Sequence, residues 1–211
     1  MRASTTFRIL IAAAFAFLVM VCHAQTGTQA VATKPFTDPQ RGVSFRYPAQ
    51  WTLATEQHFY IPESILTLPA PQSGGHATAR AAVFLDAKDW PGLQKTNLNG
   101  ADFAYNTRRG APMQACTAWL HRQVSFDKTS EETRNGISFT HVSTGSAGLC
   151  HQADESIYIH QAGGTCFFFD LAVHTLCPGV VEGTRAITPG ELKDVRAQLQ
   201  TIFDTVRISP P

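Results

Sequence analysis

The sequence predicts a single α+β domain in which an antiparallel sheet is covered by helices on its faces. Two hairpin turns, at Asn135-Gly136 and at Gly163-Gly164, separate strand-like stretches. The strand that returns from the second turn is apolar on both faces over residues 167–173, so layers must cover it on both sides. An amphipathic helix over residues 189–206 is placed to supply one of these layers.

The first 24 residues are predicted to be a secretory signal peptide that is cleaved after Ala24. Two arginines give a positive start, residues 9–21 form an uncharged apolar run, and small residues stand at the −3 and −1 positions. This run is too short to span a bilayer permanently. We therefore expect a periplasmic or secreted protein with no stable membrane anchor after signal removal. Lipidation of Cys22 is the alternative, although the bulky Val21 before it fits that processing site badly.

The mature chain is expected to consist of a flexible linker, residues 25–34, and one domain, residues 35–208. The linker has no periodicity, and Ser209-Pro210-Pro211 cannot continue a helix or a central strand. Removing the two signal arginines from the 17 Lys and Arg residues leaves 15 against 16 Asp and Glu residues. This balance argues against nucleic acid as a partner and against electrostatic binding to an anionic membrane.

The elements in the first half of the chain follow from local patterns. Short strands are predicted at residues 43–47, 65–68 and 78–85, and around Phe103 and Tyr105. Pro112 is expected in the first turn of a helix whose apolar side chains share one face, namely Met113, Cys116, Trp119 and Leu120.

The second half of the chain is predicted to hold two hairpins and the closing helix. The first hairpin joins a short strand near Glu132 to a longer one over residues 137–142, and the second runs from about residue 150 to residue 176. Between them, Gly145-Ser146-Ala147-Gly148 lacks the spacing of a nucleophile elbow, and we expect a loop there. The closing helix begins with a capping box at residues 188–191, and its apolar stripe is Leu192, Val195, Leu199, Ile202, Phe203 and Val206.

Residues 42–51 read Gly-Val-Ser-Phe-Arg-Tyr-Pro-Ala-Gln-Trp, which places Tyr47, Pro48 and Trp51 around a turn. Read from the residues alone, the motif is structural: Pro48 ends a strand and Trp51 returns to the core, the alternative being an exposed indole that binds a ligand. This G-x-x-F-x-Y-P-x-x-W pattern resembles the opening of PsbP/DcrB-like domains. The hairpins and the last helix are similar to small exported bacterial members in order and spacing.

The resemblance covers residues 36–208 and implies a PsbP-like α/β/α sandwich. Members of that family are mostly accessory or binding proteins without known catalysis, so the resemblance implies no catalytic residues.

Four cysteines remain after signal removal, and an even number in an exported chain suggests two disulfides, with three connectivities open. If the second hairpin is unbroken, Cys150 stands opposite Cys177, and Cys166 points to the other face, where the helix carrying Cys116 can meet it. We therefore predict the bonds Cys150–Cys177 and Cys116–Cys166, and one bulge would break this register. A catalytic Cys150-His151 pair is the weaker alternative, because neighbours on a strand point to opposite faces.

No metal, cofactor or catalytic set is predicted. The spacing of the histidines fits no metal-ligand pattern: His58, His121, His141, His151, His160 and His174. Tyr158 and His160 are expected on one hairpin face, and His174 near Asp154. The acidic pairs Glu131-Glu132 and Asp154-Glu155 are expected at solvated strand ends.

The sequence therefore predicts an exported, non-catalytic binding or accessory protein whose ligand is an unknown protein or small molecule. The long segment Asp86–Gly100, which carries Trp90, is the expected contact loop. Two alternatives stay open. One is a hydrolase-type or metal-dependent enzyme whose site assembles only in three dimensions, and the other is an envelope-associated structural protein.

Overall fold

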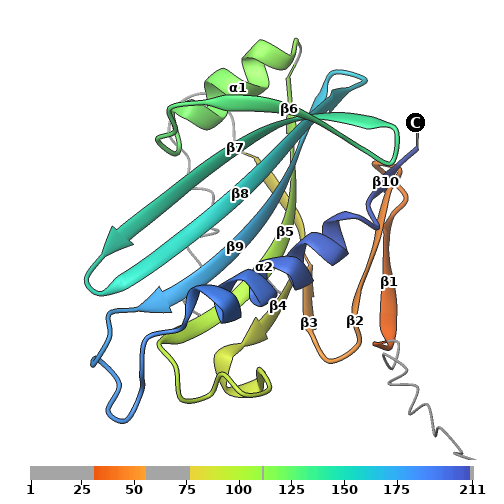
Figure 1. Cartoon of the computed structure of the whole chain (residues 1–211). Coiled ribbons are helices and arrows are strands. Elements are labelled where there is room, and N and C mark those ends of the chain that lie inside the picture. The colour runs from red at the N-terminus through yellow and green to blue at the C-terminus, as the bar shows by residue number, and fades with distance from the viewer. Residues whose placement is uncertain (1–30, 56–76, 111, 210–211) are drawn as a thin grey trace, which may run out of the picture. The chain divides into compact units, whose positions relative to one another are not determined.

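A computed structural model of the chain describes residues 31–55, 77–110 and 112–209. Their strands form two antiparallel sheets (Figure 1). The smaller sheet has the order β1-β2-β10, made of Thr33–Asp38, Val43–Pro48 and Arg207–Ile208. The larger sheet has the order β3-β4-β5-β9-β8-β7-β6, made of Thr52–Thr55, Thr78–Asp86, Leu98–Arg109, Thr165–Leu176, His151–Ala162, Ile137–Gly148 and Thr129–Arg134.

Both predicted hairpin turns are confirmed. Asn135 and Gly136 have φ angles of 53° and 77°, and Gly163 and Gly164 have φ angles of 54° and 70°, so each turn uses two left-handed residues. The β8–β9 ladder then runs without a bulge from the pair Ala162–Thr165 to the pair His151–Leu176. The register on which the cysteine prediction depended is therefore present.

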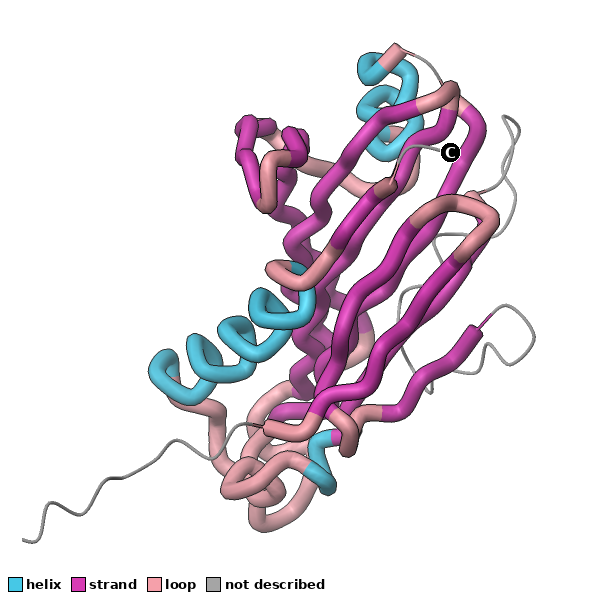
Figure 2. Tube along the Cα trace, turned by 90° about the vertical axis from the view of Figure 1, so that its right-hand side faces the viewer, coloured by secondary structure: helices cyan, strands magenta, loops and turns pink. Residues whose placement is uncertain are grey.

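Helix α2, Pro189–Phe203, covers one face of the larger sheet, as its apolar stripe predicts (Figure 2). It begins with the predicted capping box, in which Thr188 and Glu191 satisfy each other's backbone N–H groups. At its other end Phe203 is fully buried, and its ring stacks on that of Tyr158 with a centroid distance of 4.1 Å.

Helix α1, Met113–His121, packs on the opposite face, near the β8–β9 turn. It begins one residue later than predicted, because Pro112 acts as its cap instead of its first residue. Cys116, Trp119 and Leu120 are buried against β7, β8 and β9, and Cys116 is bonded to Cys166. Helices therefore lie on both faces of the larger sheet, so the predicted α+β fold with covered faces is confirmed.

Several boundaries differ from the predicted ones. Strand β1 was not predicted and begins at Thr33, inside the expected linker; β3 and β10 were not predicted either, because each is very short. Residues 145–148 belong to β7, so the expectation of a loop there is wrong. The strand expected at residues 65–68 lies outside the described residues. Within the described part of the chain, neither helix is long and apolar enough to cross a membrane.

Candidate functional site

The opening motif has a structural role in the described chain. Trp51 is 2 % exposed, and its ring meets the ring of Trp90 edge-on at a centroid distance of 5.8 Å. Tyr47 is also buried, and Pro48 closes β2. Trp90 is only 4 % exposed, so its side chain belongs to the core and a contact by this segment would use its other residues. The segment before β5 turns its apolar side chains inward, and its backbone remains a predicted contact loop.

The four cysteines form one disulfide and one pair of facing thiols. The predicted bond Cys116–Cys166 joins α1 to β9, and both of its residues are fully buried. Cys150 and Cys177 lie opposite each other, since the backbone N–H of Cys177 donates to the carbonyl oxygen of Cys150 at 2.9 Å. Both carry free thiols, so the second bond stays a prediction.

The histidines do not meet in one site. His141 and His160 lie on the α2 side of the sheet, where the rings of Tyr158 and Phe139 contact them. Tyr158 and His160 share a face, as predicted, because both contact Phe139. His121 packs edge-on against Phe126, and His58 lies outside the described residues.

His174 is not close to Asp154, contrary to expectation. It pairs with Ala153 across the ladder, and neighbouring residues of a strand point to opposite faces. Asp154 instead forms an ion pair with Arg196 of α2, while the Nε2 atom of His174 lies 2.6 Å from an Asp102 carboxylate oxygen.

Four ionisable side chains are buried together on the sheet face opposite α2: Asp102, Glu155, Asp170 and His174. Asp102 of β5 and Glu155 of β8 both stand opposite Ala172 of β9, so they flank it from either side. The expectation of a solvated strand end is wrong for Glu155, because it lies inside β8 and is 5 % exposed. We refer to these four residues as the buried acidic cluster.

The environment of the buried acidic cluster shifts the pKa values of its members. Burial raises the pKa of Asp170 well above its usual range, and the charges of Glu155 and Asp102 raise it further. Burial also raises the pKa of Glu155, against the attraction of His174. For His174, burial lowers the pKa, but its hydrogen bond to Asp102 and the two nearby carboxylates outweigh this, so the net shift is upward.

A catalytic role for the buried acidic cluster would need a path for substrate. Three depressions that described residues line contain none of its four side chains. Among residues 31–55, 77–110 and 112–209, no three His, Cys, Asp or Glu side chains are placed to hold a metal ion. The direct consequence of the cluster is electrostatic, a dependence of stability on pH.

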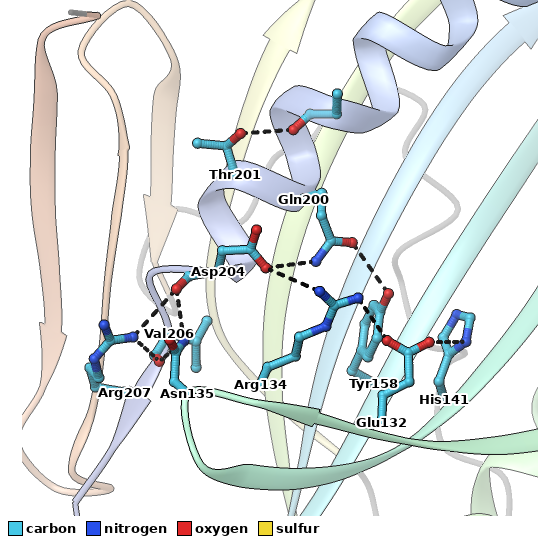
Figure 3. Close-up of polar contacts among 11 residues, drawn as sticks. Glu132, Arg134, Asn135, His141, Tyr158, Gln200, Thr201, Asp204, Val206 and Arg207 are labelled. Carbon is cyan, nitrogen blue, oxygen red and sulfur yellow. Dashed lines mark hydrogen bonds and ion pairs between the residues drawn. The ribbon is translucent and has the colours of Figure 1, made fainter.

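A polar network fixes the turn of the β6–β7 hairpin to the end of α2 (Figure 3). Arg134 donates to Glu132 at 2.9 Å, and Glu132 lies 3.3 Å from the Nδ1 atom of His141. Burial lowers the pKa of His141, and the Glu132 carboxylate offsets part of this shift. The side chain of Asn135 donates to the carbonyl oxygens of Asp204 at 2.7 Å and Val206 at 3.3 Å.

The substitution Asn135→Gly is expected to lower the free energy of unfolding by ~1–2 kcal/mol, because it keeps the left-handed turn and removes both hydrogen bonds to the end of α2. Asn135→Ala is expected to cost ~1 kcal/mol more, since alanine disfavours the positive φ angle. Urea unfolding of the two variants measures both effects. A glycine variant as stable as the parent would show that these bonds contribute nothing.

The second half of β7, Ser143–Gly148, has an open edge. Strand β6 pairs with β7 only from Ile137 to Val142, and no other described strand continues on that side. The two-residue turn makes Arg134–Ile137 a hydrogen-bonded pair, so the odd-numbered residues of β7 direct their N–H and C=O groups away from β8. The backbone groups of Ser143, Gly145 and Ala147 therefore point outward. We call Ser143–Gly148 the open edge.

The open edge lacks the features that block the other edges of the two sheets. Strand β6 carries Glu131, Glu132 and Arg134, β1 carries Lys34 and Pro35, and β3 has only four residues. The open edge reads Ser-Thr-Gly-Ser-Ala-Gly and has neither charge nor proline. On its other face, Thr144 donates to the carbonyl oxygen of Ser125 at 2.7 Å, which holds the strand in place.

A depression of about 340 Å³ adjoins the open edge on the α2 side of the sheet. Its floor is formed by small residues of β7, and Val173 and Leu192 supply apolar walls. The ion pair between Asp154 and Arg196 stands beside it. The residues that line it are Gly145, Ala147, Gln152, Ala153, Asp154, Val173, Thr175 and Leu192. Two further depressions, of about 340 and 240 Å³, lie at the smaller sheet.

No family model and no curated protein matches the sequence. Several solved structures are similar in fold. Cyanobacterial PsbP from Synechocystis sp. PCC 6803 is 11% identical with a TM-score of 0.46, covering 87% of this chain and 96% of its own. The Ran-binding protein Mog1p of Saccharomyces cerevisiae is 8% identical with a TM-score of 0.47, and the match covers 86% of this chain and 97% of Mog1p. LpqN of Mycobacterium tuberculosis, which is involved in cell envelope biogenesis, is 13% identical with a TM-score of 0.42, covering 87% and 94%. At these values the similarities carry no argument about function.

Proposed function

We propose that this chain is an exported binding or accessory protein that captures an extended polypeptide segment as an added strand beside β7. The single observation that carries the proposal is the open edge, with its outward-pointing backbone groups next to a depression. Strand addition of this kind uses main-chain hydrogen bonds for affinity and adjoining pockets for selectivity. The buried disulfide Cys116–Cys166 supports the exported location, because such bonds persist in oxidising compartments.

The backbone of the open edge supports hydrogen bonding to a partner. Ser143, Gly145 and Ala147 offer three N–H and three C=O groups on one side of the strand, and all three residues are exposed. Their small side chains leave these groups accessible. A segment of about six residues in extended conformation matches the length of the open edge.

The depression supports selection of one side chain of that segment. A strand added beside β7 lies about 4.8 Å from it and directs every second side chain to the α2 side. A side chain at the level of Gly145 or Ala147 can therefore enter the side of the depression that these two residues line. The volume of about 340 Å³ and the apolar walls favour an aliphatic or aromatic side chain.

Selection from a pool of random twelve-residue peptides displayed on phage tests the proposal. We expect enriched peptides to share an apolar residue in an extended, proline-poor sequence and to bind the purified protein. Ala147→Lys is expected to weaken binding at least ~10-fold, because it places a charge at an exposed position beside the depression. The matched control is Thr133→Lys, which adds the same charge at an exposed position of β6.

Failure to enrich any peptide would reject strand addition at this edge. Equal binding by Ala147→Lys and the parent would also reject it, provided that both variants unfold at the parent temperature. A loss of binding in Thr133→Lys alone would assign the contact to β6 instead.

A further inference from the structure

The turn that follows the open edge has an unusual backbone for its sequence. Gly148 pairs with His151, so Leu149 and Cys150 are the two residues of a tight hairpin turn. Their φ angles are 47° and 67°, in the left-handed region that glycine and asparagine prefer and that leucine and cysteine disfavour. Leu149 is almost fully exposed, so core packing does not explain this choice of residues.

Cys150 faces Cys177, the residue after the end of β9. The main-chain hydrogen bond between them continues the β8–β9 ladder by one pair. Residues in such a hydrogen-bonded pair have Cα atoms about 5.5 Å apart, and disulfides span about 4.4–6.8 Å between Cα atoms. The neighbouring thiol of Cys150 raises the pKa of Cys177. The main-chain hydrogen bond therefore holds the two cysteines side by side.

The two cysteine pairs differ in their access to solvent. Both residues of Cys116–Cys166 are fully buried under α1, whereas Cys150 is exposed and Cys177 is partly exposed. Thiol–disulfide exchange requires an incoming thiolate or disulfide to reach the sulfur. Of the two cysteine pairs, Cys150–Cys177 is the one that such a reagent can reach.

We propose that Cys150 and Cys177 are a reversible thiol–disulfide exchange site, with a protein or small-molecule disulfide as its oxidant. The thiolate of Cys150 attacks one sulfur of the oxidant, whose S–S bond breaks and releases one thiolate. The thiolate of Cys177 then attacks the Sγ atom of Cys150, forming the intramolecular bond and releasing the second thiolate. Two electrons pass to the oxidant, and the two protons of the cysteines end on its thiols.

The bond would tie the turn after the open edge to the end of β9. Because Gly148 is directly before this turn, oxidation fixes the end of the segment that we propose as the peptide site. This consequence rests on the proposed function, whereas the exchange chemistry does not.

A redox titration of the purified protein tests the exchange site. The protein is equilibrated with mixtures of reduced and oxidised dithiothreitol, alkylated, and weighed intact, with peptide mapping to assign each thiol. We expect two separate transitions, in which Cys150–Cys177 is reduced at a ratio of reduced to oxidised reagent at least ~10-fold lower than Cys116–Cys166. In the double variant Cys150→Ser/Cys177→Ser, only the second transition should remain.

One transition for all four thiols would overturn the proposal, as would thiols at Cys150 and Cys177 that stay alkylatable in fully oxidised reagent. Peptide binding by the parent protein is measured separately. Binding to the parent while the redox titration fails leaves the proposed function intact, whereas two redox transitions without any peptide binding reject strand addition without touching the exchange site.

Discussion

A chain that ends at Glu191 is expected not to fold. It loses most of α2 and all of β10, and with them Val195, Leu199, Ile202, Phe203 and Val206, which are all buried in the main core, and the partly buried Leu192. Burying six such side chains contributes ~9–18 kcal/mol before the entropy of ordering them is subtracted. Domains of this size have a net stability of about 5–15 kcal/mol, so a loss of this order removes the folded state.

Circular dichroism and thermal unfolding measure this effect of truncation. The matched control is a chain that ends at Ser209, which keeps α2 and β10 and should unfold at the parent temperature. A soluble product ending at Glu191 with the parent strand content and a cooperative transition would contradict the packing of α2 described here.

Asp170→Asn is expected to stabilise the protein progressively as the pH rises. The folded-state pKa of Asp170 is raised, so the folded chain binds this proton more tightly than the unfolded chain. The stabilising contribution of the proton is fully present below the usual carboxyl pKa, near 3.8, and is lost as the pH rises through the folded value. Because asparagine does not ionise, the variant should match the parent near pH 4 and exceed it by ~1–3 kcal/mol near pH 8.

The difference between variant and parent, measured by urea unfolding at several pH values, isolates this carboxyl group. This difference is needed because other groups also change the stability of the parent with pH. The raised pKa values of Glu155 and His174 lower the free energy of unfolding as the pH rises, as Asp170 does. The lowered pKa of His141 has the opposite effect. Asp194→Asn, which removes the same kind of charge at an exposed position of α2, is the matched control. A constant difference across the pH range would contradict the burial of an ionisable Asp170.

Features that depend on neighbouring residues were predicted from the sequence. The turns at residues 135–136 and 163–164 follow from residues that tolerate a positive φ angle, and the capping box and apolar stripe define α2. The second turn fixes the register of β8 and β9, which turns Cys166 to the face that α1 covers. The bond Cys116–Cys166 was predicted from this register.

Features that depend on distant contacts were not predicted. Asp102 and Glu155 share a buried face only because β9 lies between β5 and β8, an order that no local pattern states. Trp90 is in a long polar segment, and its burial depends on Trp51, which belongs to another element. The open edge was misread as a loop, because small residues give no periodic signal even where β8 holds them in a strand.

Amide hydrogen exchange with and without a selected peptide tests the central claim most directly. If the peptide adds as a strand, the amides of Ser143, Gly145 and Ala147 should exchange at least ~10-fold more slowly in the complex, because their N–H groups point to the partner. Those of Thr144 and Gly148 should change little, since they already face β8. Protection that appears only at β6, at the depressions beside the smaller sheet or in the segment Asp86–Gly100 would contradict the account.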